Sequence, residues 1–233
     1  MIKNIIGVRE SKIDAVFFDC DGTLSKIEGI DYLASFSTNM QEVASLTALS
    51  MGSVGLSCDM YQQRLELIRP ARTHLLQLAE AYYAAMTQDL LATISILQSL
   101  GKEIYVISAG NAPAVTLFAE KIGIPASKVM AVELFFDDDG NYVGFDEDSP
   151  LVTQNGKSMM IRQLRSKYEY KQVAFIGDGM NDVPARDEVD QFIGYGAHFY
   201  RKKVKELSDS YVVDKSMFAV LSLLLTRDES LSL

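Results

Sequence analysis

The sequence is poor in three features that each define a class of proteins: cysteine, runs of basic residues and long apolar stretches. It contains only two cysteines, Cys20 and Cys58, among 233 residues, too few for a disulfide-stapled scaffold. Cys20 also lies within a turn that carries the chemistry described below, where a disulfide would immobilise the backbone. The cysteine content therefore favours a reducing compartment, and we expect a cytoplasmic protein.

Positive charge is scarce as well. The formal net charge is −9 and the isoelectric point is near 4.8. Arg201–Lys203 is the only basic run, and we interpret it as a solvated helix face. Because nucleic acids and anionic membranes bind basic surfaces, the charge argues against both as partners.

No segment approaches the roughly 20 uncharged apolar residues that cross a bilayer. The apolar stretch at the N-terminus is too short for a signal peptide and is interrupted by Arg9 and Glu10. With 48% hydrophobic and 23% charged residues, the chain is instead long enough to bury a sizeable core. We therefore expect a soluble globular protein.

What the sequence does contain is an alternation of short apolar runs with helical stretches. The runs of strand length are residues 15–18, 104–107, 173–176, 192–193 and 211–213. Gly101 and Gly123 follow helical patterns as stop signals, and Asn111 with Pro113 marks a helix start. This alternation predicts an α/β fold with a parallel sheet covered on both faces.

Two segments depart from the alternation. Residues 25–83 show helical periodicity without a convincing strand, which predicts a small helical cap between the first two strands, or alternatively a lateral helical layer. Residues 132–136 and 142–145 flank an Asp-Gly turn and predict a β-hairpin. Tyr142 stands where a calcium loop needs glycine, so we reject the calcium site. The expected domains are a core (1–24 and 84–233) and a cap (25–83).

Aspartates follow two of the predicted strands. Asp19 and Asp21 come directly after the first strand, and Asp178 and Asp182 follow the strand at 173–176. Ligands of open α/β sheets bind at the carboxyl ends of strands, so we expect all four to share one crevice. Four carboxylates around a phosphate would repel it without a divalent cation, and the site therefore implies Mg²⁺.

The chemistry that suits these residues is phosphoryl transfer through an aspartate. A carboxylate is ionised at neutral pH, so Asp19 can attack phosphorus, and Asp21 can act as general acid and then general base. Ser108 and Lys157 are weak signals individually, since such residues are usually a helix cap and a surface charge. Their order relative to the aspartates makes them candidate phosphate ligands.

The ordered set Asp19-Cys20-Asp21-Gly22-Thr23, Ser108, Lys157 and Gly177-Asp178-Gly179 followed by Asp182 resembles the haloacid dehalogenase superfamily of phosphatases. This resemblance implies a Rossmann-like core, an aspartyl-phosphate intermediate on Asp19 and acid/base catalysis by Asp21. It also implies a Mg²⁺ site made by Asp19, the Asp21 carbonyl and Asp178. The acids embedded in residues 177–182 themselves suit a cation, and we expect Asp182 to bind it directly or through water.

Further segments, including Ile27–Asp31, Ala48–Gly52 and Gln63–Ile68, resemble the phosphoserine phosphatase family over roughly residues 13–215. That resemblance implies hydrolysis of O-phospho-L-serine in serine biosynthesis, with Glu28 holding the substrate ammonium and Arg64 its carboxylate. It places Met51, Ser108, Ala109, Lys157 and Asn181 in the substrate site. One anion and one bidentate cation are what a zwitterionic amino acid requires.

This chain departs from the phosphoserine phosphatase pattern mainly at Ser57, where the family usually has an aromatic pocket residue. A serine there enlarges or wets the pocket, so other small substrates, such as phosphoethanolamine or phosphohomoserine, and transfer to an acceptor alcohol remain open alternatives. A non-enzymatic phosphoacceptor would also use a strand-end aspartate, but Asp21 would hydrolyse its phosphoryl group. The sequence leaves monomer and homodimer equally open.

Overall fold

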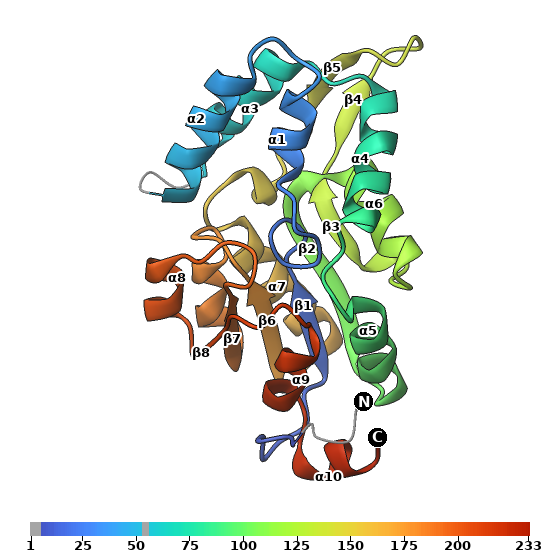
Figure 1. Cartoon of the computed structure of the whole chain (residues 1–233), viewed down its shortest axis with the longest axis vertical. Helices are drawn as coiled ribbons and strands as arrows, with labels where there is room; N and C mark the ends of the chain where they lie inside the picture. The colour runs from blue at the N-terminus through green and yellow to red at the C-terminus, as the bar shows by residue number, and fades with distance from the viewer. Residues whose placement is uncertain (1–5, 53–55) are drawn as a thin grey trace.

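The computed structural model describes residues 6–52 and 56–233, and for residues 50–52 the backbone only. Its centre is a six-stranded sheet in the order β3-β2-β1-β6-β7-β8, in which every pairing is parallel (Figure 1). The strands are β1 (Ala15–Phe18), β2 (Glu103–Asn111), β3 (Val129–Val132), β6 (Val173–Gly177), β7 (Gln191–Tyr195) and β8 (Ser210–Val212). The predicted α/β fold is confirmed.

Strand β1 lies in the middle of the sheet because all four of its residues are apolar and buried. Phe18 pairs with Val106 of β2 on one side and with Ile176 of β6 on the other. The chain runs outward from β1 through β2 to β3, then returns to β6 and runs outward the other way. The order therefore reverses between β1 and β6, which is where ligands bind in such sheets.

Helices flank this sheet, and α6 packs on β2 and β3 while α5 packs on β2 and α9. The helices of the core are α5 (Leu90–Ser99), α6 (Ala112–Lys121), α7 (Gly156–Tyr168), α8 (Lys202–Leu207), α9 (Phe218–Leu224) and α10 (Arg227–Leu231). Short 3₁₀ turns cover Ala126–Lys128, Pro150–Val152 and Val183–Glu188. None of the described helices has both the length and the apolar character needed to cross a bilayer.

The helical insertion between β1 and β2 is confirmed. It consists of α1 (Gly29–Ala34), α2 (Met40–Gly52), α3 (Cys58–Ile68) and α4 (Arg72–Ala84). Helices α1 to α3 lie at the end of the molecule opposite the two termini, whereas α4 packs on both α1 and α6 (Figure 1). Helix α4 thus joins the insertion to the core.

The hairpin is confirmed as β4 (Leu134–Phe136) and β5 (Tyr142–Phe145), an antiparallel pair. Its first arm was expected to begin at Val132, and this was wrong: Val132 ends β3, a strand of the main sheet that the sequence pattern did not reveal. Strand β3 is short and mostly half-buried, so it lacks the continuous apolar run that marked its neighbours. The hairpin contacts the cap, since the Arg72 amide donates to the Gly140 carbonyl at 2.8 Å.

Candidate active site

A pocket lies where the cap meets the carboxyl ends of the central strands. The core contributes Asp19, Asp21, Ser108, Ala109, Gly110, Asn111 and Asn181 to its lining, and the cap contributes Glu28, Ile30, Thr47, Leu56, Tyr61 and Arg64. The space between its lining atoms, mouth and adjoining solvent included, is about 610 Å³. Both parts of the chain therefore contact any ligand bound there.

The turn after β1 positions the first aspartate. The Asp19 amide continues the sheet pairing by donating to the Ile176 carbonyl at 2.9 Å, and the Cys20 amide donates to Asp19 Oδ1 at 2.7 Å. Gly22 has φ of 67°, and a Cβ at this position would collide with the Asp178 carboxylate. Glycine is therefore required both for the turn and for the close approach of the two loops.

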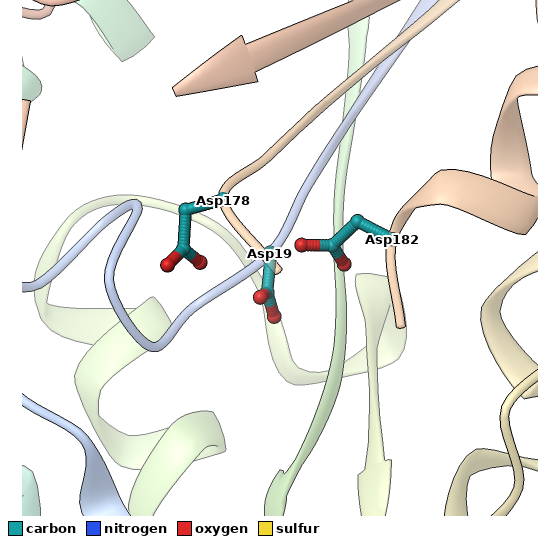
Figure 2. A group of neighbouring side chains, drawn as sticks. All are labelled: Asp19, Asp178 and Asp182. Atoms are coloured by element: carbon teal, nitrogen blue, oxygen red, sulfur yellow. The ribbon is translucent and has the colours of Figure 1, made fainter. Parts of the chain in front are cut away.

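Three carboxylates from the loops after β1 and β6 converge at the sheet edge. Figure 2 shows Asp19, Asp178 and Asp182 side by side, and one oxygen of each lies within 4.8 Å of the others. All three residues are buried. Neither oxygen of Asp178 accepts a hydrogen bond of good geometry within the described chain, although its Oδ2 forms an ion pair with Arg201. In contrast, both oxygens of Asp182 are engaged, by Lys157 and by the Gly179 amide at 2.8 Å.

Lys157, at the start of α7, is buried between two of these acids. Its Nζ lies 2.7 Å from Asp19 Oδ1 and 2.5 Å from Asp182 Oδ1. Burial opposes the charged ammonium, but Asp182 and Asp19 outweigh it and raise the pKa of Lys157 above its ordinary value. Burial, together with Asp182, raises the pKa of Asp19 well above its usual range, against the attraction of Lys157. A surface position for Lys157 is therefore wrong.

Asp21 is held by two donors from the helical insertion. Its Oδ1 accepts from the Gly29 amide and, at 2.8 Å, from the Tyr82 hydroxyl. Burial raises the pKa of Asp21, and these two bonds oppose the shift. A carboxyl whose pKa lies nearer to neutrality is suited to exchange a proton.

Ser108 also belongs to the site and does not cap a helix. It lies within β2, and its Oγ is 3.5 Å from Asp21 Oδ2 and accepts from the Gly110 amide at 2.9 Å. A side chain on Gly110 would press against both Asp21 and Ser108. The next residue along from Ser108, Ala109, lines the pocket as expected.

Arg201 is a site residue that the sequence reasoning missed. The basic run predicts a solvated helix face shared with Lys202 and Lys203, but the Arg201 guanidinium contacts Glu28, which lines the pocket. It donates to Glu28 Oε1 at 3.1 Å and to the Asp178 carbonyl at 3.0 Å, and it forms an ion pair with the Asp178 carboxylate. Burial, then the Asp21 charge, raises the pKa of Glu28 to about 7, while Arg201 opposes the shift.

Arg64 contrasts with these paired charges. It is only 6% exposed, yet no carboxylate lies within ion-pair distance of it in the described parts of the chain. Its one hydrogen bond to a described residue runs from Nε to the Met60 carbonyl at 3.4 Å. Burial lowers the pKa of Arg64, and the charges of Asp31 and Glu28 oppose the shift. A buried guanidinium that no carboxylate contacts directly is costly unless a ligand supplies the anion.

The remaining predicted residues differ in how they meet the site. Asn181 lines the pocket, and its Oδ1 is buried without a hydrogen-bond partner among the described residues. Met51 lies in α2, but its side chain falls outside the described residues. Ser57 is exposed and serves as the N-cap of α3, accepting from the Met60 amide at 3.3 Å. Leu56, its neighbour, lines the pocket instead.

Tyr82 is a second residue that the sequence reasoning missed. Helical periodicity placed it on an apolar face of the expected helix, where its hydroxyl gave no separate signal. For Arg201, the sequence did contain a signal. The basic run at residues 201–203 comes after a predicted strand, as Asp19 and Asp178 do, and the carboxyl ends of parallel strands share one edge of the sheet.

Comparisons with known proteins agree with this geometry. Residues 13–189 match the family model described as haloacid dehalogenase-like hydrolase. The chain is 36% identical to phosphoserine phosphatase of Mus musculus over 201 residues, covering 86% of this chain and 89% of the mouse protein. It is 31% identical to the chloroplastic phosphoserine phosphatase of Arabidopsis thaliana, covering 84% and 68% of the two proteins.

A solved structure of a substrate-bound phosphoserine phosphatase complex superimposes with a TM-score of 0.77. The match covers 91% of this chain and 98% of that one, at 22% identity. At that identity the likeness establishes the fold alone.

Proposed function

This chain belongs to the haloacid dehalogenase-like hydrolase family, and on that basis we propose that it hydrolyses O-phospho-L-serine to L-serine and phosphate. The observation that carries the choice of substrate is Arg64, a buried guanidinium in the same pocket as Asp19 that no described carboxylate contacts directly. A substrate carboxylate would supply the missing anion. The mouse and Arabidopsis relatives, both phosphoserine phosphatases, support the same choice.

In the proposed reaction, the Asp19 carboxylate attacks phosphorus and forms an acyl phosphate as the bond from phosphorus to the serine oxygen breaks. Asp21 donates a proton to that leaving oxygen and later removes one from the water that hydrolyses the acyl phosphate. The raised pKa of Asp21 and its fixed orientation beside Tyr82 support this role. Tyr82 positions Asp21 and does not itself exchange the proton.

The phosphoryl oxygens are proposed to be held by Ser108, Lys157 and Asn181, with Ala109 forming the wall beside them. Lys157 carries the only ammonium group within ion-pair distance of Asp19 in the described chain, and Asn181 brings a buried amide with an unused oxygen. Because Asp182 binds Lys157, we assign it the task of orienting that ammonium, besides its place in the acidic cluster.

The residues present fit a divalent cation, for which we propose Mg²⁺. Asp178 offers a buried Oδ1 without a partner in the described chain, while its Oδ2 is paired with Arg201. Asp19 lies beside it, and oxygen ligands are what Mg²⁺ prefers. Five acids (Asp19, Asp21, Glu28, Asp178 and Asp182) face three cations, Lys157, Arg201 and Arg64, so negative charge is in excess. When bound, the ion neutralises negative charge on the transferring phosphoryl group.

Removal of metal tests this assignment directly. Dialysis against EDTA should abolish hydrolysis of every phosphomonoester, and Mg²⁺ should restore it, whereas full activity in EDTA would contradict the cation site. Ca²⁺ provides a comparison, because it prefers more ligands at longer distances and should restore less activity.

The substrate is tested by kcat/KM on a panel of phosphomonoesters. The expected order is O-phospho-L-serine first, then phosphoethanolamine, which lacks the carboxylate, then p-nitrophenyl phosphate. Phosphohomoserine tests the length of the pocket, and added alcohols test phosphotransfer to an acceptor. Equal kcat/KM for phosphoserine and phosphoethanolamine would remove the carboxylate role of Arg64 and the substrate proposal with it.

We further propose that residues 25–83 act as the substrate-selecting cap on a core of residues 1–24 and 84–233, with the Met51 side chain against the substrate. Serine biosynthesis in the cytoplasm is the proposed setting, supported by the unpaired thiols of Cys20 and Cys58. Light scattering of the purified chain decides between monomer and homodimer, and fractionation of cells decides the compartment.

A further inference from the structure

Asn111 occupies a helix N-cap position but does not cap the helix. It ends β2 and precedes α6, where an asparagine side chain ordinarily accepts a hydrogen bond from the first turn. Here its Nδ2 instead donates to the Tyr61 hydroxyl of α3 at 3.0 Å. This bond joins the core to the cap, and both residues are buried and line the pocket.

The bond leaves the Tyr61 hydroxyl with an unused hydrogen. A phenol has one O–H donor, and its oxygen here already accepts from Asn111. No described residue accepts the Tyr61 hydrogen, so a donor remains available in the lining of the pocket. The cation nearest to this ring is Arg64, whose Cζ lies 5.7 Å from the ring centre.

We propose that Tyr61 is a specificity-determining residue that donates a hydrogen bond to the substrate carboxylate held by Arg64, and that Asn111 is the positioning residue that orients it. This inference rests on the proposed phosphoserine function and deepens it. A carboxylate offers about four lone-pair sites, so bidentate binding by the guanidinium leaves room for the phenol. The cap then presents one charged and one neutral donor to the same group.

This arrangement increases discrimination against substrates without a carboxylate. Phosphoethanolamine would leave both the guanidinium and the phenol without an acceptor in a buried pocket, and unmade bonds to buried polar groups are costly. Tyr61 therefore selects the substrate by its carboxylate, a group that takes no part in phosphoryl transfer.

The test is Tyr61→Phe, assayed as the Mg²⁺-loaded protein with O-phospho-L-serine, phosphoethanolamine and p-nitrophenyl phosphate. Loss of a hydrogen bond to a charged group should lower kcat/KM for phosphoserine about tenfold, mostly through KM. The values for the other two substrates should stay within about twofold of wild type. The inhibition constant of L-serine, which reports binding without turnover, should rise by a factor similar to that for KM.

Tyr105→Phe is the matched control. Tyr105 is as buried as Tyr61, and its hydroxyl also has one partner, Tyr170 at 2.8 Å, but it does not line the pocket. It should leave all three substrates unchanged. Asn111→Ala should reproduce part of the selective loss for phosphoserine, because the phenol loses its orientation.

Two results would overturn the inference while leaving the proposed function intact. If wild type prefers phosphoserine but Tyr61→Phe lowers all three substrates equally, Tyr61 serves packing alone. If Tyr61→Phe changes none of them, its hydroxyl does not reach the carboxylate. If wild type itself shows no preference for phosphoserine over phosphoethanolamine, the proposed function fails first, and this inference fails with it.

Discussion

The core and the cap face each other across one pocket, but they handle charge in opposite ways. In the core, Lys157 is locked between Asp19 and Asp182, so its charge is satisfied before any ligand arrives. In the cap, Arg64 is nearly as buried, yet it has no counterion within the described chain. The core is thus organised for a reaction common to all phosphomonoesters, and the cap for one feature of a particular substrate.

This difference follows from how each part is built. The core acids sit on loops that leave adjacent parallel strands, whose register fixes their spacing. The cap residues project from helices α1 and α3, which reach the core through side-chain contacts such as Glu28 with Arg201. Changes in the core should therefore affect all substrates alike, whereas changes in the cap should separate one substrate from another.

The largest effect is expected for Asp19→Asn. An amide is a very poor nucleophile towards phosphorus, so turnover of every substrate in the panel should fall by roughly 10⁴-fold or more. Asp59→Asn, on the exposed face of α3, is the matched control and should retain full activity. Circular dichroism of both variants verifies the fold. Loss of phosphoserine hydrolysis alone would contradict a nucleophilic role for Asp19.

A smaller but selective effect is expected for Arg64→Ala. It should raise KM for phosphoserine about 100-fold, because truncating one partner of a buried charge pair costs on the order of 2–5 kcal/mol. Activity towards p-nitrophenyl phosphate should change little. Arg69→Ala is the control: it follows the same helix, but its side chain is 61% exposed and pairs with Glu66. Equal losses on both substrates would place Arg64 outside carboxylate binding.

The next effect is a pH dependence of substrate preference, which we expect from Glu28 of the cap. Burial and the Asp21 charge raise the pKa of Glu28 to about 7 against the attraction of Arg201, so Glu28 is ionised above that pH and neutral below it. Only the ionised form attracts an ammonium. The ratio of kcat/KM for phosphoserine to that for p-nitrophenyl phosphate should therefore fall as pH decreases below 7, approaching tenfold per unit.

In this ratio of kcat/KM values, the effect of protonating groups that act on both substrates cancels. Glu28→Gln should make the ratio low and flat from pH 5 to 8, while Glu66→Gln, an exposed position on α3, should keep the wild-type profile. A wild-type ratio that does not vary with pH would remove Glu28 from ammonium binding.

The sequence was informative wherever local pattern and position along the chain coincide. Strand β1 is a fully buried apolar run, and the aspartates that follow it and β6 needed only the parallel-sheet rule to be brought together. The helical insertion and the hairpin likewise follow from local periodicity and turn chemistry. The family resemblance added candidate roles for Glu28 and Arg64, which residue type alone would assign to the surface.

What the sequence could not supply were contacts between distant side chains. Asn111 carries a sound N-cap signal, yet a tertiary partner takes its side chain. Arg201 looked solvated because a basic run contains no information about the acids it will meet. Family position assigns Ser57 to the pocket, but in the structure Ser57 caps α3 and its neighbour Leu56 lines the pocket.

The smallest effect expected concerns this last pair. Ser57→Ala removes the N-cap bond of α3 and should lower the free energy of unfolding by about 1 kcal/mol in urea titration, with substrate ratios unchanged. Leu56→Ala, one residue earlier, removes apolar pocket wall and should raise KM for phosphoserine. Ser57→Ala thus reports on the stability of the cap, and Leu56→Ala reports on how the cap contacts the substrate. If Ser57→Ala instead shifts substrate preference and leaves stability unaltered, the pocket extends to Ser57. The choice of substrate would then depend on Ser57 as well as on Arg64 and Glu28.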